Sequence, residues 1–123
     1  MKNNLKHEIM WWMSRLTIML TSLFLSMTLA AQAYAADIQM GANGNLVFEP
    51  NEVTINVGET VTFTNGDLPP HNMVFNEYPE LSHPDLAFVA GESFNVTFDK
   101  AGEYEFQCEP HAGAGMKGVI HVK

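Results

Sequence analysis

The sequence has a single cysteine, Cys108, and few basic residues. One cysteine cannot form an intramolecular disulfide, so a disulfide-stapled scaffold is excluded. Six Lys and Arg stand against 14 Asp and Glu, which gives a formal net charge of −8 at pH 7. Nucleic-acid binding requires a basic face, so we expect no nucleic-acid partner. The acidic balance favours solubility or attraction to a basic partner, and composition alone leaves both open.

The chain also lacks a long apolar run. Its most apolar stretch, residues 16–30, contains Thr and Ser and is short for a membrane span. Basic residues precede this stretch, and Ala33-Tyr34-Ala35 follows it with small residues at alternate positions. This pattern is typical of a secretory signal peptide and favours it over a membrane anchor. We therefore expect residues 1–36 to be removed by cleavage after Ala35 or Ala36, which leaves no segment for stable membrane insertion.

Residues 37–123 then form the mature chain, which is large enough for one small domain with a single core. They contain no internal repeat, low-complexity tract or linker. Three Lys and no Arg stand against thirteen Asp and Glu, so this part has a net charge of −10. The unpaired thiol of Cys108 would be exposed to oxidation after export, and ligation to a metal would hold it as a shielded thiolate.

The mature chain lacks any sustained helical period. Short alternating runs separated by turn residues predict an all-β fold. The alternation places Val53, Ile55 and Val57 on one buried face, and it places Cys108 at the buried end of a later strand. The least regular segment, residues 76–88, has room for one helical turn. About eight strands favour a two-sheet Greek-key β-sandwich. We expect these strands over residues 37–41, 46–49, 53–57, 60–64, 73–75, 91–98, 103–108 and 118–123.

The mature chain is organised around one loop, Cys108-Glu109-Pro110-His111-Ala112-Gly113-Ala114-Gly115-Met116. A cysteine, a histidine or a methionine standing alone would usually be an ordinary core or surface residue, but this loop contains all three. Gly113 and Gly115 allow the backbone to turn back, so that His111 and Met116 can face the same point as Cys108. Thiolate, imidazole and thioether donors suit copper far better than Mg²⁺ or Ca²⁺, which prefer oxygen.

A fourth donor has to come from elsewhere, and His71 in Pro69-Pro70-His71-Asn72 is the natural candidate. Two His, one Cys and a weak axial Met form the ligand set of blue-copper electron-transfer sites. We expect His83 and His121 at the surface and not at the metal. The predicted ligands of one copper ion, with the site at one end of the sandwich, are therefore His71, Cys108, His111 and Met116.

This ligand set predicts a soluble one-electron carrier that cycles between Cu(I) and Cu(II) and is not an enzyme. The protein fills all four coordination positions, which leaves none open for a substrate. A copper enzyme would need further copper and further His clusters, but only His83 and His121 remain in the mature chain. A copper chaperone or store would favour exposed, labile ligands over a set fixed on a rigid sandwich.

The mature sequence resembles the plastocyanins, blue-copper proteins of the cupredoxin family, and the cyanobacterial members more than the plant ones. The resemblance covers essentially all of residues 37–123. Its most specific part is the spacing Cys-x-x-His-x-x-x-x-Met with Gly-Ala-Gly inside it. The other matching segments are Leu46-Val47-Phe48-Glu49-Pro50, Pro70-His71-Asn72-Met73-Val74-Phe75, Leu81-Ser82-His83 and Ala90-Gly91-Glu92-Ser93-Phe94.

The family implies a cupredoxin-like sandwich with copper bound by the same four residues. It also implies that the side chain of Asn72 braces the loop after Cys108, and that His111 is the exposed ligand through which electrons pass. An apolar docking patch would surround this histidine, formed by Leu46, Leu68, Pro70 and Ala114.

The resemblance further implies a function in photosynthetic electron transport. Family members are monomers that carry electrons from cytochrome f of the cytochrome b6f complex to photosystem I, in transient complexes in the thylakoid lumen. The alternative is a periplasmic cupredoxin that donates electrons to a different oxidase or reductase. Three residues depart from the family pattern, namely Gln107 in place of the usual Tyr, Ala112 and Lys117. They leave the copper ligands intact but leave open a second electron route and the electrostatic mode of docking.

Overall fold

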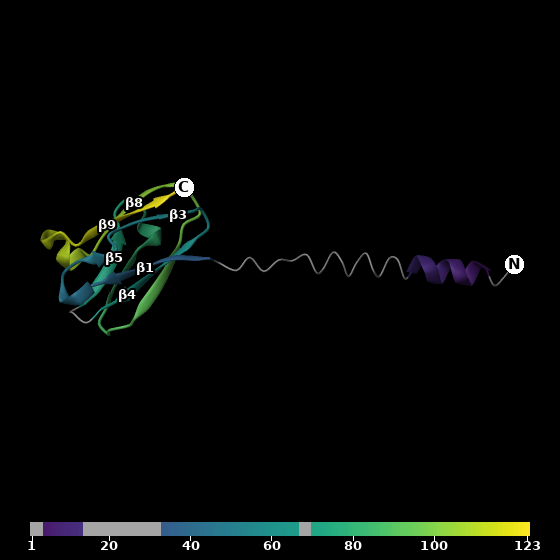
Figure 1. Cartoon of the computed structure of the whole chain (residues 1–123), viewed down its shortest axis with the longest axis horizontal. Helices are drawn as coiled ribbons and strands as arrows, with labels where there is room; N and C mark the ends of the chain where they lie inside the picture. Colours follow the sequence, from purple (N-terminus) through teal and green to yellow (C-terminus); the bar gives the residue numbers. More distant parts are fainter. Residues whose placement is uncertain (1–3, 14–32, 67–69) are drawn as a thin grey trace. The chain divides into compact units, whose positions relative to one another are not determined.

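The computed structural model describes residues 4–13, 33–66 and 70–123 of the chain. The chain divides into two units, residues 1–31 and 32–123. In the first unit, residues 4–13 form an exposed helix (Figure 1). None of the helices in the described ranges is long and apolar enough to cross a membrane. The apolar run at 16–30, on which the predicted signal peptide rests, lies outside the described residues.

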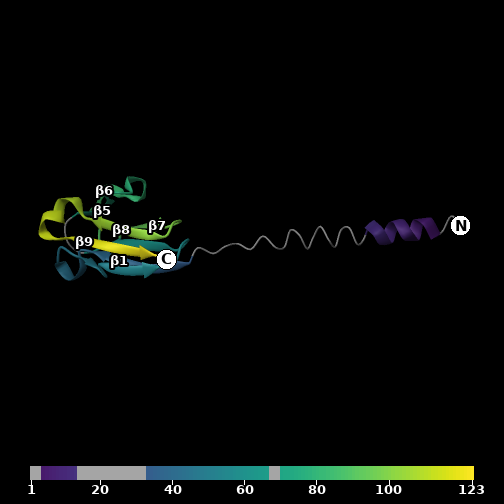
Figure 2. The same ribbon diagram turned by 90° about the horizontal axis from the view of Figure 1, so that it is seen from above.

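The described part of the second unit contains two sheets of strands that lie face to face (Figures 1 and 2). Together they form the predicted all-β sandwich. The first sheet has the strand order β2-β1-β4-β7, with β1 (Tyr34–Met40), β2 (Phe48–Glu49), β4 (Thr60–Asn65) and β7 (Ser93–Thr97). The second has the order β3-β9-β8-β5-β6, with β3 (Glu52–Ile55), β5 (His71–Phe75), β6 (His83–Ala87), β8 (Gly102–Gln107) and β9 (Lys117–Val122).

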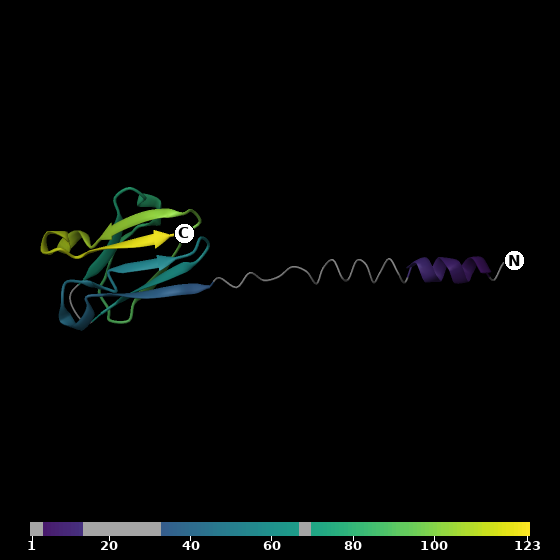
Figure 3. The same ribbon diagram turned by 45° about the horizontal axis from the view of Figure 1, so that its top comes forward.

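The chain passes repeatedly from one sheet to the other, as expected for a Greek-key sandwich. Strand β1 pairs in parallel with β4, and β3 pairs in parallel with β9, while the remaining pairs are antiparallel. Short 3₁₀-helical segments lie in the connections, namely η1 (Ala42–Gly44), η2 (Pro79–Leu81) and η3 (Glu109–Ala114). Figure 3 shows η1 and η3 at the same end of the sandwich, opposite the C-terminus.

Aromatic side chains fill the space between the sheets. The ring of Phe106 in β8 lies edge-on to Phe48, Phe63 and Phe75, with centroid distances of 4.8, 5.4 and 5.8 Å. Edge-to-face pairs of this kind add stability beyond the area they bury. The predicted inward alternation in this strand is confirmed, because Tyr104, Phe106 and Cys108 are all buried. The cysteine therefore directly follows a strand whose inward side chains lie in the aromatic core.

Five predicted strand boundaries are wrong by two residues or more. β2 begins at Phe48 rather than at residue 46, β5 at His71 rather than at 73, and β7 at Ser93 rather than at 91. The start of β1 and the end of β3 also differ. β1 begins at Tyr34 rather than at residue 37, because residues 34–36 pair with the start of β4. β3 ends at Ile55, and Val57, predicted to be buried, is 48% exposed. The reason is an early turn in which the backbone N–H of Asn56 donates to the carboxylate of Glu59 at 2.7 Å.

The segment predicted to be least regular contains two elements. A 3₁₀ turn at Pro79–Leu81 agrees with the expected helical turn, but the edge strand β6 was not predicted. Met73 of β5 pairs with His83, which starts β6, and the ring of His83 stacks on Phe94 at 4.1 Å between centroids. Prolines and acidic residues obscured this strand, because an edge strand can accommodate both without losing interior hydrogen bonds.

Candidate metal centre

The topology brings the start of β5 beside the end of β8. These strands are antiparallel, and Val74 of β5 lies opposite Gln107 of β8. His71, the first residue of β5, therefore lies close to Cys108, which follows β8 directly. The turn η3 then carries His111 back over the same point. Three predicted residues from two separate parts of the sequence are thus brought together at one end of the sandwich.

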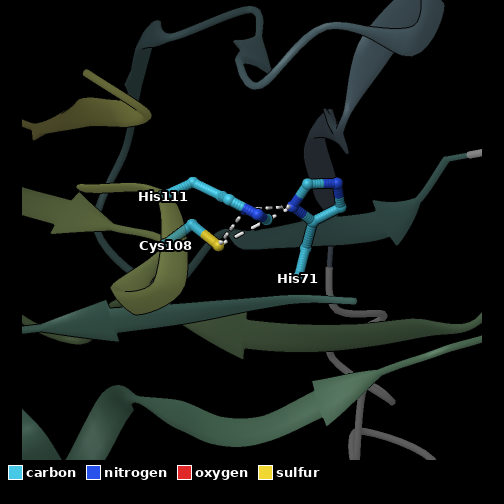
Figure 4. A group of neighbouring side chains, drawn as sticks. All are labelled: His71, Cys108 and His111. Carbon is cyan, nitrogen blue, oxygen red and sulfur yellow. Dashed lines mark hydrogen bonds between the residues drawn. The ribbon is translucent and has the colours of Figure 1, made fainter. Parts of the chain in front are cut away.

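The donor atoms of these residues form a tight triangle (Figure 4). Nδ1 of His71 lies 3.7 Å from Sγ of Cys108 and 3.2 Å from Nδ1 of His111. Sγ of Cys108 lies 3.4 Å from Nδ1 of His111. His71 and Cys108 are fully buried and His111 is partly exposed. This is the group of His, Cys and acidic side chains in the described ranges that could hold a metal ion.

Burial sets the protonation states of the metal-free site. Burial, together with the nearby His111, lowers the pKa of His71, so the imidazole stays neutral and keeps a lone pair for a metal. Burial also raises the pKa of the Cys108 thiol, and the charge of Glu109 acts in the same direction, although backbone hydrogen bonds from Asn72 and His111 partly oppose both. A bound cation would replace the thiol proton. Two imidazoles and a thiolate fit copper.

Short backbone hydrogen bonds close the loop that carries the ligands. The N–H of Cys108 donates to the carbonyl of Met116 at 3.1 Å, and the N–H of Met116 donates to the carbonyl of His111 at 3.2 Å. Gly115 ends η3 with φ +88°, and its N–H donates to Ala112 at 3.0 Å. Met116 is fully buried and lies beside Cys108 through this backbone pairing. Its role as the fourth, sulfur ligand stays a prediction.

Asn72 connects the loop to the sheet. Its side-chain oxygen accepts the backbone N–H of Glu109 at 2.9 Å. Its amide nitrogen donates to the Glu109 carboxylate at 2.8 Å and to the carbonyl of Pro84 at 3.0 Å. One buried side chain therefore joins β5, β6 and the ligand loop. The part played by the Glu109 carboxylate had no signal in the sequence, because it depends on a partner 37 residues away.

The residues predicted to form a docking patch have different surroundings. Ala114 is exposed, Pro70 is partly exposed, and Leu46 is partly buried against the core. Leu68 lies outside the described residues. Their role in docking stays a prediction.

Sequence reasoning missed three exposed apolar side chains close to the site. Leu86, Phe88 and Val89 surround Ala87, which pairs with His71, and Phe88 is 72% exposed and Val89 66% exposed. The amide of Asn65 donates to the carbonyl of Val89 at 3.1 Å. The exposed side chains of Phe88 and Val89 are therefore held in place on the surface.

The two remaining histidines of this unit do not join the triangle. His83 is stacked on Phe94, and Nε2 of His121 lies 2.9 Å from the carboxylate of Glu52. Nδ1 of His121 lies 3.1 Å from Glu103. Both side chains are partly exposed, as predicted, although His83 lies on a strand rather than in a loop.

Comparisons with known proteins agree with this site. Residues 35–123 match the family model for copper-binding proteins of the plastocyanin/azurin family. The chain is 48% identical over 105 residues to a chloroplastic plastocyanin of Tetradesmus obliquus, covering 78% of this chain and 72% of that protein. It is 50% identical over 95 residues to a plastocyanin of Scenedesmus fuscus, covering 70% and 97%.

Solved structures show the same fold. Oxidised plastocyanin from Dryopteris crassirhizoma superposes with a TM-score of 0.65 at 33% identity, covering 71% of this chain and 99% of that one. Amicyanin from Paracoccus versutus superposes with a TM-score of 0.59 at 28% identity, covering 78% and 86%.

Proposed function

The chain belongs to the plastocyanin/azurin family of copper-binding proteins, and from this premise we propose that it carries electrons from cytochrome f of the cytochrome b6f complex to photosystem I. The family and the donor triangle together make the chain a cupredoxin electron carrier with one copper ion. The single observation behind this function is the convergence of His71, Cys108 and His111, whose Nδ1 and Sγ atoms lie within 3.7 Å of each other.

The bound ion supplies a one-electron couple between Cu(I) and Cu(II). His71, Cys108 and His111 would hold it, and Met116 would be the weak fourth donor that tunes the potential. The protein fixes these donors in advance, because His71 starts a sheet strand and the others lie on a loop closed by backbone hydrogen bonds. Fixed donors limit the rearrangement that accompanies each gain or loss of an electron. With all positions taken by protein, we infer that the chain catalyses no reaction of its own.

The exposed edge of His111 is the proposed path for the electron. His71 and Cys108 are fully buried, so they offer no direct contact to a partner. Gln107 occupies the position before Cys108, where an aromatic ring would be needed for a second route. We therefore propose a single exit through His111.

The surface around this exit fits a partner with an apolar contact face. Ala114 is exposed, Pro70 is partly exposed, and Leu46 is partly buried against the core. Phe88 and Val89 enlarge the apolar area beyond what the sequence predicted. A net charge of −10 over residues 37–123 favours a basic rim on the partner and a transient complex of a monomer.

The proposed location is the thylakoid lumen, after export and removal of residues 1–36. The chloroplastic plastocyanins among the relatives support this location. A periplasmic cupredoxin with another oxidase or reductase as its partner is the alternative. Cleavage after Ala35 or Ala36 would shorten β1 at its start and leave the pairing of Ile38 with Phe63 intact.

Flash-induced re-reduction of photosystem I tests the proposal. The reduced, copper-loaded protein is mixed with photosystem I particles, and the rate is measured against protein concentration. The control is the same chain loaded with zinc, which is redox-inactive and fills the same donors. We expect a second-order rate with copper and none with zinc. If the copper-loaded protein is blue but no faster than the zinc control, the photosynthetic partner is wrong while the carrier assignment remains.

A further inference from the structure

Gly41 lies directly behind the buried copper ligand. It follows β1 and precedes η1, and its φ of +75° is in the left-handed region that favours glycine. Its N–H donates to the carbonyl of Val47 at 2.9 Å, which fixes the position of its backbone. Gly41 is 30 residues from His71 in the sequence and directly follows a strand of the other sheet.

The space between Gly41 and the imidazole admits no side chain. A Cβ atom added to Gly41 would lie 2.4 Å from Nε2 of His71, 3.0 Å from Cδ2 and 3.4 Å from Cε1. The contact therefore falls on the far edge of the ring, while Nδ1 faces Cys108 and His111 (Figure 4). The ring lies between the backbone of Gly41 on one side and the metal site on the other.

No hydrogen bond in the described ranges orients this edge of the ring. A histidine ligand usually donates its second N–H to a carboxylate, carbonyl or water, which fixes the orientation of the ring. Nε2 of His71 is buried and has no hydrogen-bond partner within the described residues. The orientation of the imidazole therefore depends on packing.

A second glycine, Gly66, packs against the backbone of Gly41. The N–H of Gly66 donates to the carbonyl of Met40 at 2.8 Å. A Cβ atom at Gly66 would lie 2.8 Å from the carbonyl oxygens of both Gly41 and Met40. Gly66 thus packs against Gly41, and Gly41 packs against the ring of His71. Each of the two contacts is too close to admit a methyl group on the glycine.

We propose that Gly41 is a positioning residue of the copper site, which sets the depth and orientation of the His71 imidazole by direct backbone contact. A methyl group at this position would push the ring toward Cys108 and His111 or rotate it away from them. Either change alters the copper geometry without removing a ligand. The same reasoning assigns Gly66 a weaker, indirect role through the backbone of Gly41.

Two other glycines provide matched controls. Gly58 and Gly91 have φ of +87° and +84°, close to that of Gly41, but an added Cβ meets nothing within 4 Å at either position. Alanine at Gly58 or Gly91 therefore has the same backbone strain without the contact. Gly66 has no positive φ, so alanine there has the contact without this strain.

The experiment compares Gly41→Ala, Gly66→Ala, Gly58→Ala and Gly91→Ala in the copper-loaded protein. Cu(II) affinity is measured by competition with a chelator, the site by its visible and electron paramagnetic resonance spectra, and stability by thermal unfolding of the metal-free form. We expect Gly41→Ala to weaken copper binding by about tenfold or more and to shift the visible band, as outer contacts of metal ligands commonly do. Gly66→Ala should shift the band less.

The controls separate contact from strain. Gly58→Ala and Gly91→Ala should lower the unfolding temperature to an extent similar to Gly41→Ala, with copper affinity and spectrum unchanged. The proposal is overturned if Gly41→Ala keeps the parent spectrum and affinity, or if the controls disturb copper equally. If Gly41→Ala does not fold, Gly66→Ala decides, and an unchanged visible band in that variant would overturn the proposal.

Discussion

The two histidines of the copper site differ in almost every respect except the atom they offer. His71 starts a sheet strand, is fully buried and is packed against backbone. His111 lies on a six-residue 3₁₀ turn outside the sheets and is partly exposed. The site therefore has two halves, a sheet half that contains His71 and a loop half that contains His111. Cys108 joins them, because it directly follows β8 and precedes η3. The comparison suggests a division of labour, in which the sheet half fixes the metal and the loop half meets the partner.

The largest effect should come from Cys108, which both halves share. Cys108→Ser replaces the thiolate with a poorly coordinating alcohol, so we expect the intense visible band of the copper form to be lost. Gln107→Ser, one residue earlier on the same strand, should keep it. Absorption spectra of the two copper-loaded variants provide the measurement. A Cys108→Ser variant that remained intensely blue would remove the basis of the assignment.

The two histidines should respond differently to deletion. His71→Gly and His111→Gly each remove one donor, so both variants should lose the parent spectrum. Added imidazole should restore the band in His111→Gly, because its site opens to solvent, and not in His71→Gly, because that site is fully buried. Titration with imidazole, followed by absorbance, is the measurement. Equal rescue of both variants would contradict the proposed difference between the halves.

Asn72 is the connection between the halves, and its removal should cost stability. Asn72→Ala removes a buried side chain and leaves the backbone N–H of Glu109 without its acceptor in a part-buried hydrogen bond, so we expect a loss of about 2 kcal/mol in the free energy of unfolding. The control is Asn95→Ala, whose exposed hydrogen bond with Thr62 should contribute within about 0.5 kcal/mol. Denaturant unfolding of the copper-loaded proteins measures both. A loss at Asn72 no larger than at Asn95 would show that the connection is weak.

The metal-free protein should be most stable in a limited pH window. The pKa of His71 is lowered from 6.5, so the unfolded chain binds more protons below that value and stability falls as pH decreases. The pKa of Cys108 is raised from 9.0, so the unfolded chain releases its proton first and stability falls as pH increases above that value. Each slope should reach about 1.4 kcal/mol per pH unit.

Thermal unfolding across this pH range tests the expectation. With copper bound, both groups are deprotonated in the folded state, so the loss at high pH should disappear. A metal-free protein whose stability is flat from well below pH 6.5 to well above pH 9.0 would show that burial of the two ligands is not coupled to folding.

The smallest effect concerns the surface near the sheet half. Phe88→Ser removes an exposed apolar side chain close to the copper end, and we expect the rate of electron transfer to photosystem I to fall by about fivefold, or ~1 kcal/mol. Val57→Ser is the control, because Val57 is also exposed but lies at the opposite end, where its N–H donates to Lys123. Second-order rates for both variants would decide. An unchanged rate in Phe88→Ser would restrict docking to the surface around His111.

Much of this arrangement could be predicted because the relevant signals are local. Alternation along residues 103–108 gave the buried face of β8, and the ligand types in one loop indicated copper before any coordinates. His71 could be inferred because a fourth donor was required. Such predictions need only residue identity and spacing.

The remaining features depend on contacts between distant segments. The role of Gly41 arises from the ring of a residue in the other sheet, and the carboxylate of Glu109 acts through Asn72. The extra start of β1 and the early end of β3 were missed because pairing and turn contacts decided them. The exposed Phe88 was missed because an apolar residue beside a strand is usually expected to face the core.

The pairing at the base of the ligand loop has one further consequence. Gln107 lies opposite Lys117 in the β8–β9 ladder, so every residue between them belongs to a hairpin connection and to no sheet. Three of the four predicted ligands thus lie on a connecting loop that is separate from the sheet framework. We therefore expect changes in the length or composition of this loop to alter the metal site while the framework, including the fourth donor on β5, stays as it is.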